Sequence, residues 1–468
     1  MSTKIRFMVY NAFGIGGTVK TIFNFADYFY DTGKYDVEII SIKKTKDTPT
    51  LPVNPKIKIT VIQDARRGAK FSEEDKELLA LPSELIDKSE DLYPMFNAYT
   101  DKKMRELLCN FEGGVLVTTM PSFNMLATEL VNDSVLKIGQ EHKSYADHSP
   151  EIQKIIRESY GKLDGLTILT ERNRHVYERK IHGELPIYVL GNGTERLKFR
   201  ADLNSHVMVA AGRYAYQKGY DMLIEAFALI ADKYPDWTLK IYGEGSLAKD
   251  YVRLIMRHGL GNRVVLESGN DKMNERYSEA SINICSSNYE PFGMTIIEGF
   301  AMGLPCVSFA CDGPREIITD GYDGLLVRKK DIEGFAAALE RVMSDEELRF
   351  ELGANAYETS KKYDINTIGQ MFQKIVETEL ERKKKNKNNN SNIVNMPQKS
   401  ENNNVVEIME RHIEDNVETE AIKPVQEELD YTQMIKASDE GHVGIRTIMK
   451  MGQGWANYKI RGNKRGKQ

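Results

Sequence analysis

The apolar residues of this chain follow a strand–helix rhythm that occurs twice along the sequence. Short apolar runs without clean polar alternation are typical of strands that are covered on both faces. The first series comprises Ile5–Tyr10, Val37–Ile42, Ile57–Ile62, Val115–Thr119, Leu136–Gln140 and Leu166–Thr170. Helical patterns such as Thr18–Tyr30 and Ile152–Tyr160 lie between these runs. This order predicts a doubly wound parallel sheet.

The same rhythm restarts after Gly191, Gly193 and a polar stretch. Its apolar runs are Val207–Ala211, Thr238–Tyr242, Val264–Leu266, Ile282–Cys285, Cys306–Phe309 and Leu325–Val327. We therefore predict an α/β chain with two Rossmann-like domains, one over residues 1–195 and one over 196–364. Open parallel sheets bind ligands at the carboxyl ends of their strands, so we expect the site in a cleft between the domains.

Composition narrows the class of protein. The 468 residues are enough for two or three domains, and 41% hydrophobic with 28% charged residues is ordinary for a globular chain. A net charge of −5 gives no support for nucleic-acid binding. The first residues resemble a strand more than a signal peptide, and no apolar stretch approaches the roughly 20 residues of a membrane span. We expect a soluble cytoplasmic protein, at most peripheral at the inner face of the cell membrane.

The four cysteines show no paired spacing of the kind that metal ligands have. Cys285, Cys306 and Cys311 lie in apolar or glycine-rich settings, where reduced core thiols are expected. A reducing compartment fits this usage. No Asp-x-Asp pair follows a predicted strand, so we expect neither a metal nor another cofactor.

The most informative stretch for function carries two glutamates, Glu290 and Glu298, eight residues apart. The apolar run before Glu290 predicts a strand, and the pattern after Gly293 predicts a helix. Glu290 is therefore expected in the loop at the strand's carboxyl end, and Glu298 more than one turn into the helix. Unpaired amides and the dipole at a helix start favour an anion. A carboxylate beside an anion site suits a ligand with hydroxyls and phosphate, such as a nucleotide sugar.

Glu-x7-Glu, followed by Gly-Leu-Pro-Cys-Val, resembles the signature of retaining GT-B glycosyltransferases of family 4. Further blocks match in the same order, namely Ala211–Arg213 with Lys218–Gly219, Tyr242–Gly245, and Gly313–Ile318 with Gly321–Val327. The resemblance covers residues 207–327 strongly and the preceding part weakly. It implies two facing Rossmann-like domains and a closing helix that returns to the first domain. Residues 365–382 are the candidate for that helix.

The resemblance also implies roles for the residues of the second domain. Glu290 would lie by the donor sugar and Glu298 would hold the ribose. Whether Glu290 is a nucleophile, an electrostatic stabiliser or only a sugar ligand stays open. The remaining donor-binding candidates of this domain are Phe292, Gly293, Met294, Thr295 and Gly243.

Arg213 and Lys218 are the candidate cations of the site. Both follow the first strand of the second domain, so they are expected at the cleft. A nucleotide sugar carries a diphosphate whose negative charge grows as the glycosidic bond breaks, and cations placed there stabilise the leaving group without a metal. The alternative is a surface Arg and Lys at a helix start.

Candidates in the first domain are fewer. Gly16 and Gly17 follow the first strand, but their spacing does not fit a dinucleotide fingerprint. Similar glycine loops in the resembling family let the backbone approach the donor phosphate and acceptor, against the alternative of a plain tight turn. The resembling family often has a His near the donor sugar at the position of His142, and the alternative is a structural role. Glu171 resembles a further cleft position.

The remaining segments carry weaker signals. Residues 46–113 hold more sequence than one βαβ step needs and are expected to cover the acceptor side. Residues 383–404 are rich in Lys and Asn, which predicts a low-complexity linker. Residues 405–468 form a tail with a basic, amphipathic end, and two readings stay open: a membrane or partner contact, and a solvated tail.

Together these features favour a retaining, metal-independent transferase that moves a hexose from a nucleotide sugar, most simply a UDP-sugar. The acceptor would be a cell-envelope glycan, a teichoic acid or an exopolysaccharide. In the front-face route usual for this fold, the leaving phosphate accepts the acceptor's proton. Two other readings stay open: a non-catalytic partner subunit of a glycosyltransferase complex, and a sugar-nucleotide epimerase.

Overall fold

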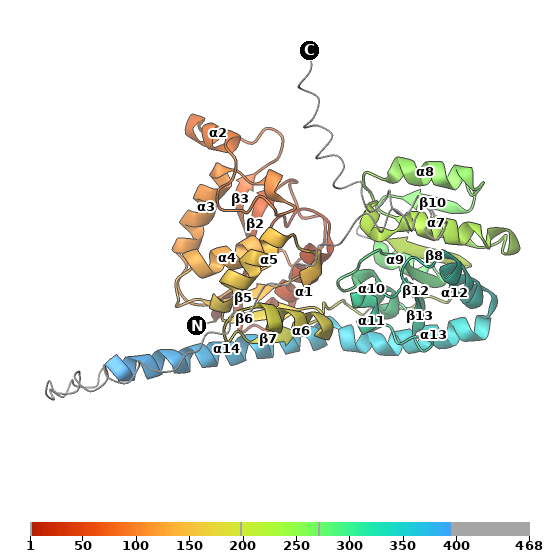
Figure 1. The fold of residues 1–468 in the computed structure, drawn as a ribbon. Coiled ribbons are helices and arrows are strands. Elements are labelled where there is room, and N and C mark those ends of the chain that lie inside the picture. Colours follow the sequence, from red (N-terminus) through yellow and green to blue (C-terminus); the bar gives the residue numbers. More distant parts are fainter. Residues whose placement is uncertain (1, 197–198, 270–271, 395–468) are drawn as a thin grey trace, which may run out of the picture. The chain divides into compact units, whose positions relative to one another are not determined.

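The computed structural model describes residues 2–196, 199–269 and 272–394, and within these ranges it contains two parallel sheets (Figure 1). The first sheet has seven strands in the order β3-β2-β1-β4-β5-β6-β7. The second has six strands in the order β10-β9-β8-β11-β12-β13. The predicted α/β class with two doubly wound sheets is confirmed.

The first sheet and its helices occupy the first half of the chain. Its strands are β1 Thr3–Val9, β2 Tyr35–Lys44, β3 Lys58–Asp64, β4 Val115–Thr118, β5 Leu136–Gln140, β6 Gly165–Ile168 and β7 Ile187–Val189. Its helices are α1 Gly17–Asp31, α2 Glu73–Ala80, α3 Ala98–Cys109, α4 Pro121–Leu130, α5 Pro150–Ser159 and α6 Glu171–Lys180, with 3₁₀ turns η1 Tyr93–Met95, η2 Tyr145–Asp147 and η3 Tyr160–Lys162. The sequence missed β7 because three half-buried residues give too short a pattern.

The second sheet follows the same rules. Its strands are β8 Val207–Ala211, β9 Thr238–Tyr242, β10 Val264–Glu267, β11 Ile282–Cys285, β12 Cys306–Phe309 and β13 Gly324–Val327. Its helices are α7 Tyr220–Ala228, α8 Ala248–Arg257, α9 Met273–Ser278, α10 Met294–Ala301, α11 Asp312–Ile317, α12 Ile332–Ser344 and α13 Glu346–Thr359, with 3₁₀ turns η4 Tyr216–Lys218, η5 Ala231–Lys233 and η6 Ser360–Tyr363. All strands predicted in both halves are present.

The strand order reverses beside the first strand of each sheet. β1 lies between β2 and β4, and β8 lies between β9 and β11. A crevice forms at the carboxyl ends of strands where the order reverses, because the neighbouring connections leave in opposite directions. The loop with Gly16 and Gly17, called the glycine loop below, follows β1, and the segment with Arg213 and Lys218 follows β8. Both therefore lie where the strand order of their sheet reverses.

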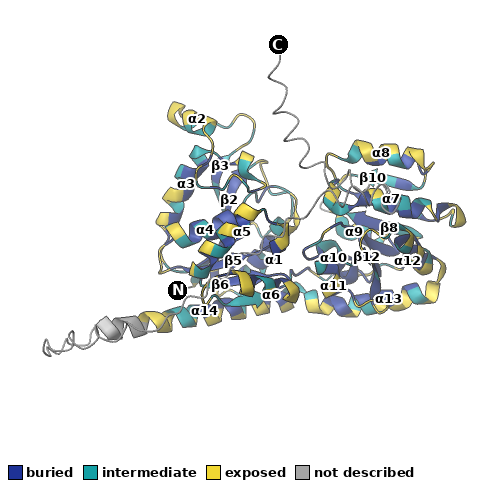
Figure 2. Ribbon diagram, viewed as in Figure 1, coloured by how far each residue is buried: buried dark blue, intermediate teal, exposed yellow. Residues whose placement is uncertain are grey.

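The central strands of both sheets and the inner helix faces are buried, as Figure 2 shows in dark blue. Cys285, Cys306 and Cys311 are free and buried, which confirms their prediction as core thiols, whereas Cys109 is exposed. Within the described ranges, no helix combines the length and apolar character that crossing a membrane requires. The cytoplasmic or peripheral location stays a prediction.

The last described helix, α14 Ile365–Val394, returns to the first sheet (Figure 1). Its Phe372 is fully buried, with ring centroids 4.9 Å from Phe25 and 5.5 Å from Phe29. The helix continues past 382, so residues 383–394 are helical where the sequence predicts a linker. Lys383 is tied to Asp164 by an ion pair of 2.7 Å, and Lys favours helix. Residues 395–404 of the linker and the tail 405–468 lie outside the described residues.

Phe372→Ala should destabilise the protein by roughly 3–5 kcal/mol, because it removes a buried ring from the aromatic cluster and leaves a cavity. Met371→Ala is the matched control on the same helix, since Met371 is 45% exposed. Urea unfolding followed by circular dichroism measures both variants. If both variants lose an equally small free energy of unfolding, the packing of α14 against the first sheet is contradicted.

Candidate functional site

The loop between β11 and α10 carries Glu290 at the carboxyl end of the strand, as predicted. Gly293 precedes α10 with φ 119°, a backbone conformation that side chains rarely adopt, and a Cβ there would lie 2.8 Å from Ile296 Cδ1. Ser286 Oγ donates to the Lys218 carbonyl oxygen at 2.9 Å, which ties this loop to the loop after β8. The two loops therefore form one unit at the edge of the sheet.

Glu290 and Lys218 form an ion pair in this unit. Glu290 Oε2 accepts from Lys218 Nζ at 2.6 Å and from Ser287 Oγ at 3.2 Å. Burial is the largest effect and lowers the pKa of the Lys218 ammonium, but the charge and hydrogen bond of Glu290, together with Cys285, outweigh it, so the pKa of Lys218 is raised. The structure thus brings together two residues that the sequence assigns to the site, with the cation charged at neutral pH.

Arg213 lies beside this pair and is exposed. Its Nη2 donates to Gln217 Oε1 at 3.1 Å, and Gln217 Nε2 donates to the Tyr289 carbonyl oxygen at 3.4 Å. A guanidinium has five N–H donors, so most of those of Arg213 stay available. Close packing requires a glycine at position 243, because a Cβ there would lie 1.9 Å from the Gly212 carbonyl oxygen.

The start of α10 offers backbone donors. The first-turn amides of Met294 and Thr295 have no acceptor within their own helix, and none is found among the other described residues. Their N–H groups and the helix dipole favour negative charge near the carboxylate–ammonium pair. Phe292 is buried, with its ring 5.9 Å from that of Tyr363, so its side chain belongs to the core.

Glu298 lies on α10 and is only 7% exposed. Its Oε1 accepts from Lys20 Nζ at 2.7 Å, and its Oε2 accepts from the Tyr277 hydroxyl at 3.1 Å. A buried carboxylate needs partners, and the described chain supplies two of them itself. Sequence reasoning missed both partners, since contacts across 278 positions for Lys20 and 21 positions for Tyr277 leave no local signal.

The glycine loop lies against the start of α10. A Cβ at Gly17 would lie 3.7 Å from Met294 Cγ, and nothing lies within 4 Å of one at Gly16. The Thr21 hydroxyl is 3.9 Å from Met294 Sδ. No close contact of the described chain demands a glycine at Gly16, which leaves room there for a ligand or a solvent-filled turn.

His142 lies in the loop after β5, next to a buried network of polar side chains. The neighbouring Glu141 accepts from the Tyr160 hydroxyl and lies 3.0 Å from His148 Nε2. Burial lowers the pKa of the His142 imidazole to about 4, against the opposing effect of Glu141, and its buried Nε2 has no hydrogen-bond partner among the described residues. His142 is therefore neutral at neutral pH.

Glu171 is the first residue of α6, and its role stays a prediction. Its amide donates to Glu316 Oε1 at 3.2 Å, and its carboxylate accepts from Arg174 Nε at 2.7 Å. Within the described ranges, neither Glu171 nor His142 makes a hydrogen bond to Glu290, Arg213 or Lys218. Of the first-domain candidates, the glycine loop thus contacts the start of α10, whereas Glu171 and His142 are not hydrogen-bonded to the Glu290 group.

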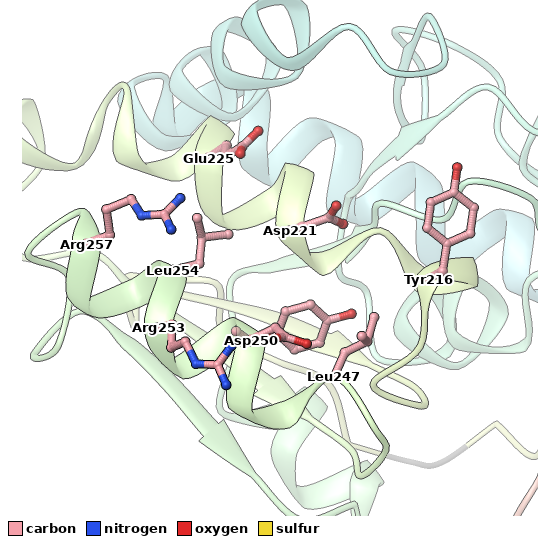
Figure 3. A pocket seen from close by; sticks show the side chains of 9 residues that line it. Tyr216, Asp221, Glu225, Leu247, Asp250, Arg253, Leu254 and Arg257 are labelled. Atoms are coloured by element: carbon pink, nitrogen blue, oxygen red, sulfur yellow. Dashed lines mark hydrogen bonds and ion pairs between the residues drawn. The ribbon is translucent and has the colours of Figure 1, made fainter. Parts of the chain in front are cut away.

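A cavity of about 460 Å³ lies between α7 and α8 (Figure 3). Asp221 and Glu225 extend from α7, and Arg253 and Arg257 extend from α8. The lining residues are Tyr216, Asp221, Glu225, Leu247, Asp250, Tyr251, Arg253, Leu254 and Arg257. The cavity contains none of the residues predicted for the site.

Comparison with known proteins agrees with this architecture. Residues 192–359, which include the second sheet, match the family described as glycosyl transferases group 1. An exopolysaccharide phosphotransferase of Streptomyces coelicolor is 29% identical over 389 residues, covering 81% of this chain and 41% of the relative. The segment 192–359 therefore belongs to the glycosyl transferase group 1 family.

Two further comparisons extend beyond this segment. An uncharacterized glycosyltransferase of Haemophilus influenzae is 25% identical over 378 residues, covering 80% of this chain and 99% of the relative. A crystal structure of S. aureus TarM with fondaparinux, alpha-GlcNAc-glycerol and UDP superposes with a TM-score of 0.65, at 17% identity, covering 80% of this chain and 99% of TarM. The fold is therefore GT-B. The chain spans less than half of the Streptomyces relative's length.

The pKa of His142 predicts a pH-dependent loss of stability. The unfolded chain binds this proton near pH 6.5 and the folded chain only near pH 4, so acidification from pH 7 to pH 5 favours unfolding by roughly 2 kcal/mol through this residue. In His142→Gln, the stability lost between pH 7 and pH 5 should be smaller by about that amount.

Urea unfolding at pH 7 and pH 5 measures this difference. His182→Gln is the control, because His182 is exposed. If His142→Gln and wild type lose the same free energy of unfolding on acidification, folding does not lower the pKa of His142.

Proposed function

We propose that this glycosyltransferase transfers a hexose, with retention, from a UDP-linked donor to a cell-envelope glycan, teichoic-acid or exopolysaccharide acceptor. The observation that carries the proposal is the Lys218–Glu290 pair beside Arg213 and the unpaired amides that begin α10. The UDP in the TarM structure supports the nucleotide. The name of the Streptomyces relative supports an exopolysaccharide-type acceptor.

The donor diphosphate would bind at the start of α10. Arg213 has free N–H donors, and the Lys218 ammonium has three donors, of which Glu290 takes one. Together with the amides of Met294 and Thr295, these groups meet the negative charge that develops on the leaving phosphate. The two side chains supply positive charge themselves, so no metal is part of the proposal.

In the proposed step, the bond between the sugar's anomeric carbon and the phosphate oxygen breaks, and the acceptor oxygen forms a bond to that carbon on the same face. The acceptor's proton passes to the leaving phosphate oxygen, and the sugar keeps its anomeric configuration. Glu290 is tied to Lys218 at 2.6 Å, which makes it a weak nucleophile. We assign it the binding of donor-sugar hydroxyls and the stabilisation of positive charge on the sugar ring.

The first-domain candidates complete the proposal. The open space at Gly16 lets the backbone approach the donor phosphate. A neutral His142 carries one donor and one acceptor nitrogen, so it can accept a hydrogen bond from a sugar hydroxyl or donate one, depending on its tautomer. Residues 46–113, which contain α2 and α3, are proposed to contact the acceptor.

Donor turnover tests this function. Purified protein with EDTA should release the nucleoside diphosphate slowly from one of UDP-glucose, UDP-galactose, UDP-N-acetylglucosamine, UDP-N-acetylgalactosamine and GDP-mannose. Arg213→Ala should slow the release about a hundredfold or more, because one donor to the leaving phosphate is worth about 3 kcal/mol of barrier. Arg257→Ala, at the end of α8, is the matched control and should behave as wild type.

Other outcomes identify the competing functions. Binding and turnover of none of these donors would favour the non-catalytic partner subunit. Conversion of a donor to its epimer without release of nucleotide would favour the epimerase. Release that Arg213→Ala leaves unchanged would contradict the assigned diphosphate site.

A further inference from the structure

The carboxylate of Glu298 accepts hydrogen bonds from side chains of two other helices. Lys20 comes from α1, beside the first sheet, and Tyr277 comes from α9, beside the second. Lys20 Nζ is 2.7 Å from Oε1, and the Tyr277 hydroxyl is 3.1 Å from Oε2. Each oxygen of the carboxylate therefore accepts one hydrogen bond from the protein.

This arrangement leaves capacity on both oxygens. An ionised carboxylate has about four acceptor positions, two on each oxygen. Lys20 and Tyr277 occupy one on each, so one on each stays available. Two neighbouring hydroxyls, such as O2′ and O3′ of a ribose, can donate to both oxygens at once. A carboxylate fixed in this way is prepared for a diol.

The ion pair between Lys20 and Glu298 also offsets the free energy that burying the Glu298 carboxylate costs. A carboxylate that is 7% exposed is costly unless it is paired, and the Lys20 ammonium supplies the opposite charge. The approach of α1 to α10 does not depend on this pair alone. The Thr21 hydroxyl lies 3.9 Å from Met294 Sδ one turn before Glu298, so the two helices pack along their first turns.

We propose that Lys20, with Tyr277, is a positioning residue that holds the Glu298 carboxylate oriented toward the ribose of the donor nucleotide. The inference rests on the proposed function, because it assumes that Glu298 binds the ribose. It adds that ribose recognition by the second domain is completed by a side chain of the first. The ligand class is a ribonucleoside diphosphate and its sugar conjugates, with 2′-deoxy analogues bound more weakly.

Isothermal titration calorimetry of the full chain with UDP and with 2′-deoxy-UDP tests this inference. Wild type should bind UDP about 10- to 100-fold more tightly, the range for a hydrogen bond to a charged group. In Lys20→Met this preference should fall to less than threefold, mainly through weaker UDP binding. Lys20→Arg should restore most of it.

A matched control removes a lysine from another Lys–Glu pair of the second domain. Lys233 Nζ lies 3.2 Å from Glu340 Oε1 at the surface, and Lys233→Met should keep the wild-type preference. Should Lys20→Met fail to fold, Tyr277→Phe removes the other donor alone and carries the same expectation. A general loss of structure would lower the affinity for both nucleotides, whereas the inference concerns their ratio.

The outcomes separate the inference from the proposed function. If wild type shows no preference, or Glu298→Ala keeps it, the assignment of Glu298 to the ribose fails. If Glu298→Ala loses the preference and Lys20→Met keeps it, the role of Lys20 is overturned and the proposed function stands. If Lys20→Met lowers the affinity for UDP and for 2′-deoxy-UDP equally, the inference is also overturned, because Lys20 would then bind the phosphates.

Discussion

The proposed donor site depends on two carboxylates that are withdrawn from water beside ammonium groups. Glu290 is paired with Lys218 at 2.6 Å, and Glu298 with Lys20 at 2.7 Å. Removing one partner of a buried pair leaves an uncompensated charge, which is far more costly than losing an exposed pair. Each ammonium therefore holds its carboxylate in place, and both carboxylates keep acceptor positions for a sugar ligand.

The two parallel sheets put these pairs where they are. β1 and β8 stand where the strand order reverses, so the loops after them open at the carboxyl edge. The loop after β8 carries Lys218 and meets the loop after β11, which carries Glu290. The helix after β1 carries Lys20 to Glu298. All four residues of the two ion pairs thus lie in the loop that follows a central strand, or in the helix after that loop.

Much of the fold was readable from the sequence, because strands covered on both faces leave apolar runs and helices leave a periodic pattern. The short β7 was missed because three half-buried residues leave too little pattern. The extension of α14 to Val394 was missed because composition alone favours a linker, whereas a tie between Lys383 and Asp164 anchors the helix. These errors occur where a distant contact outweighs local preference.

For the site, the sequence by itself determined which chemical groups are present and on which elements they lie: Glu290 in a loop, Glu298 on a helix, and Arg213 with Lys218 after a strand. Those placements follow from local patterns. Only the tertiary structure decided the partners, Lys218 for Glu290 and Lys20 with Tyr277 for Glu298. Such pairs join residues up to 278 positions apart, and the free energy that selects them, the burial of charge, exists only after the chain has folded.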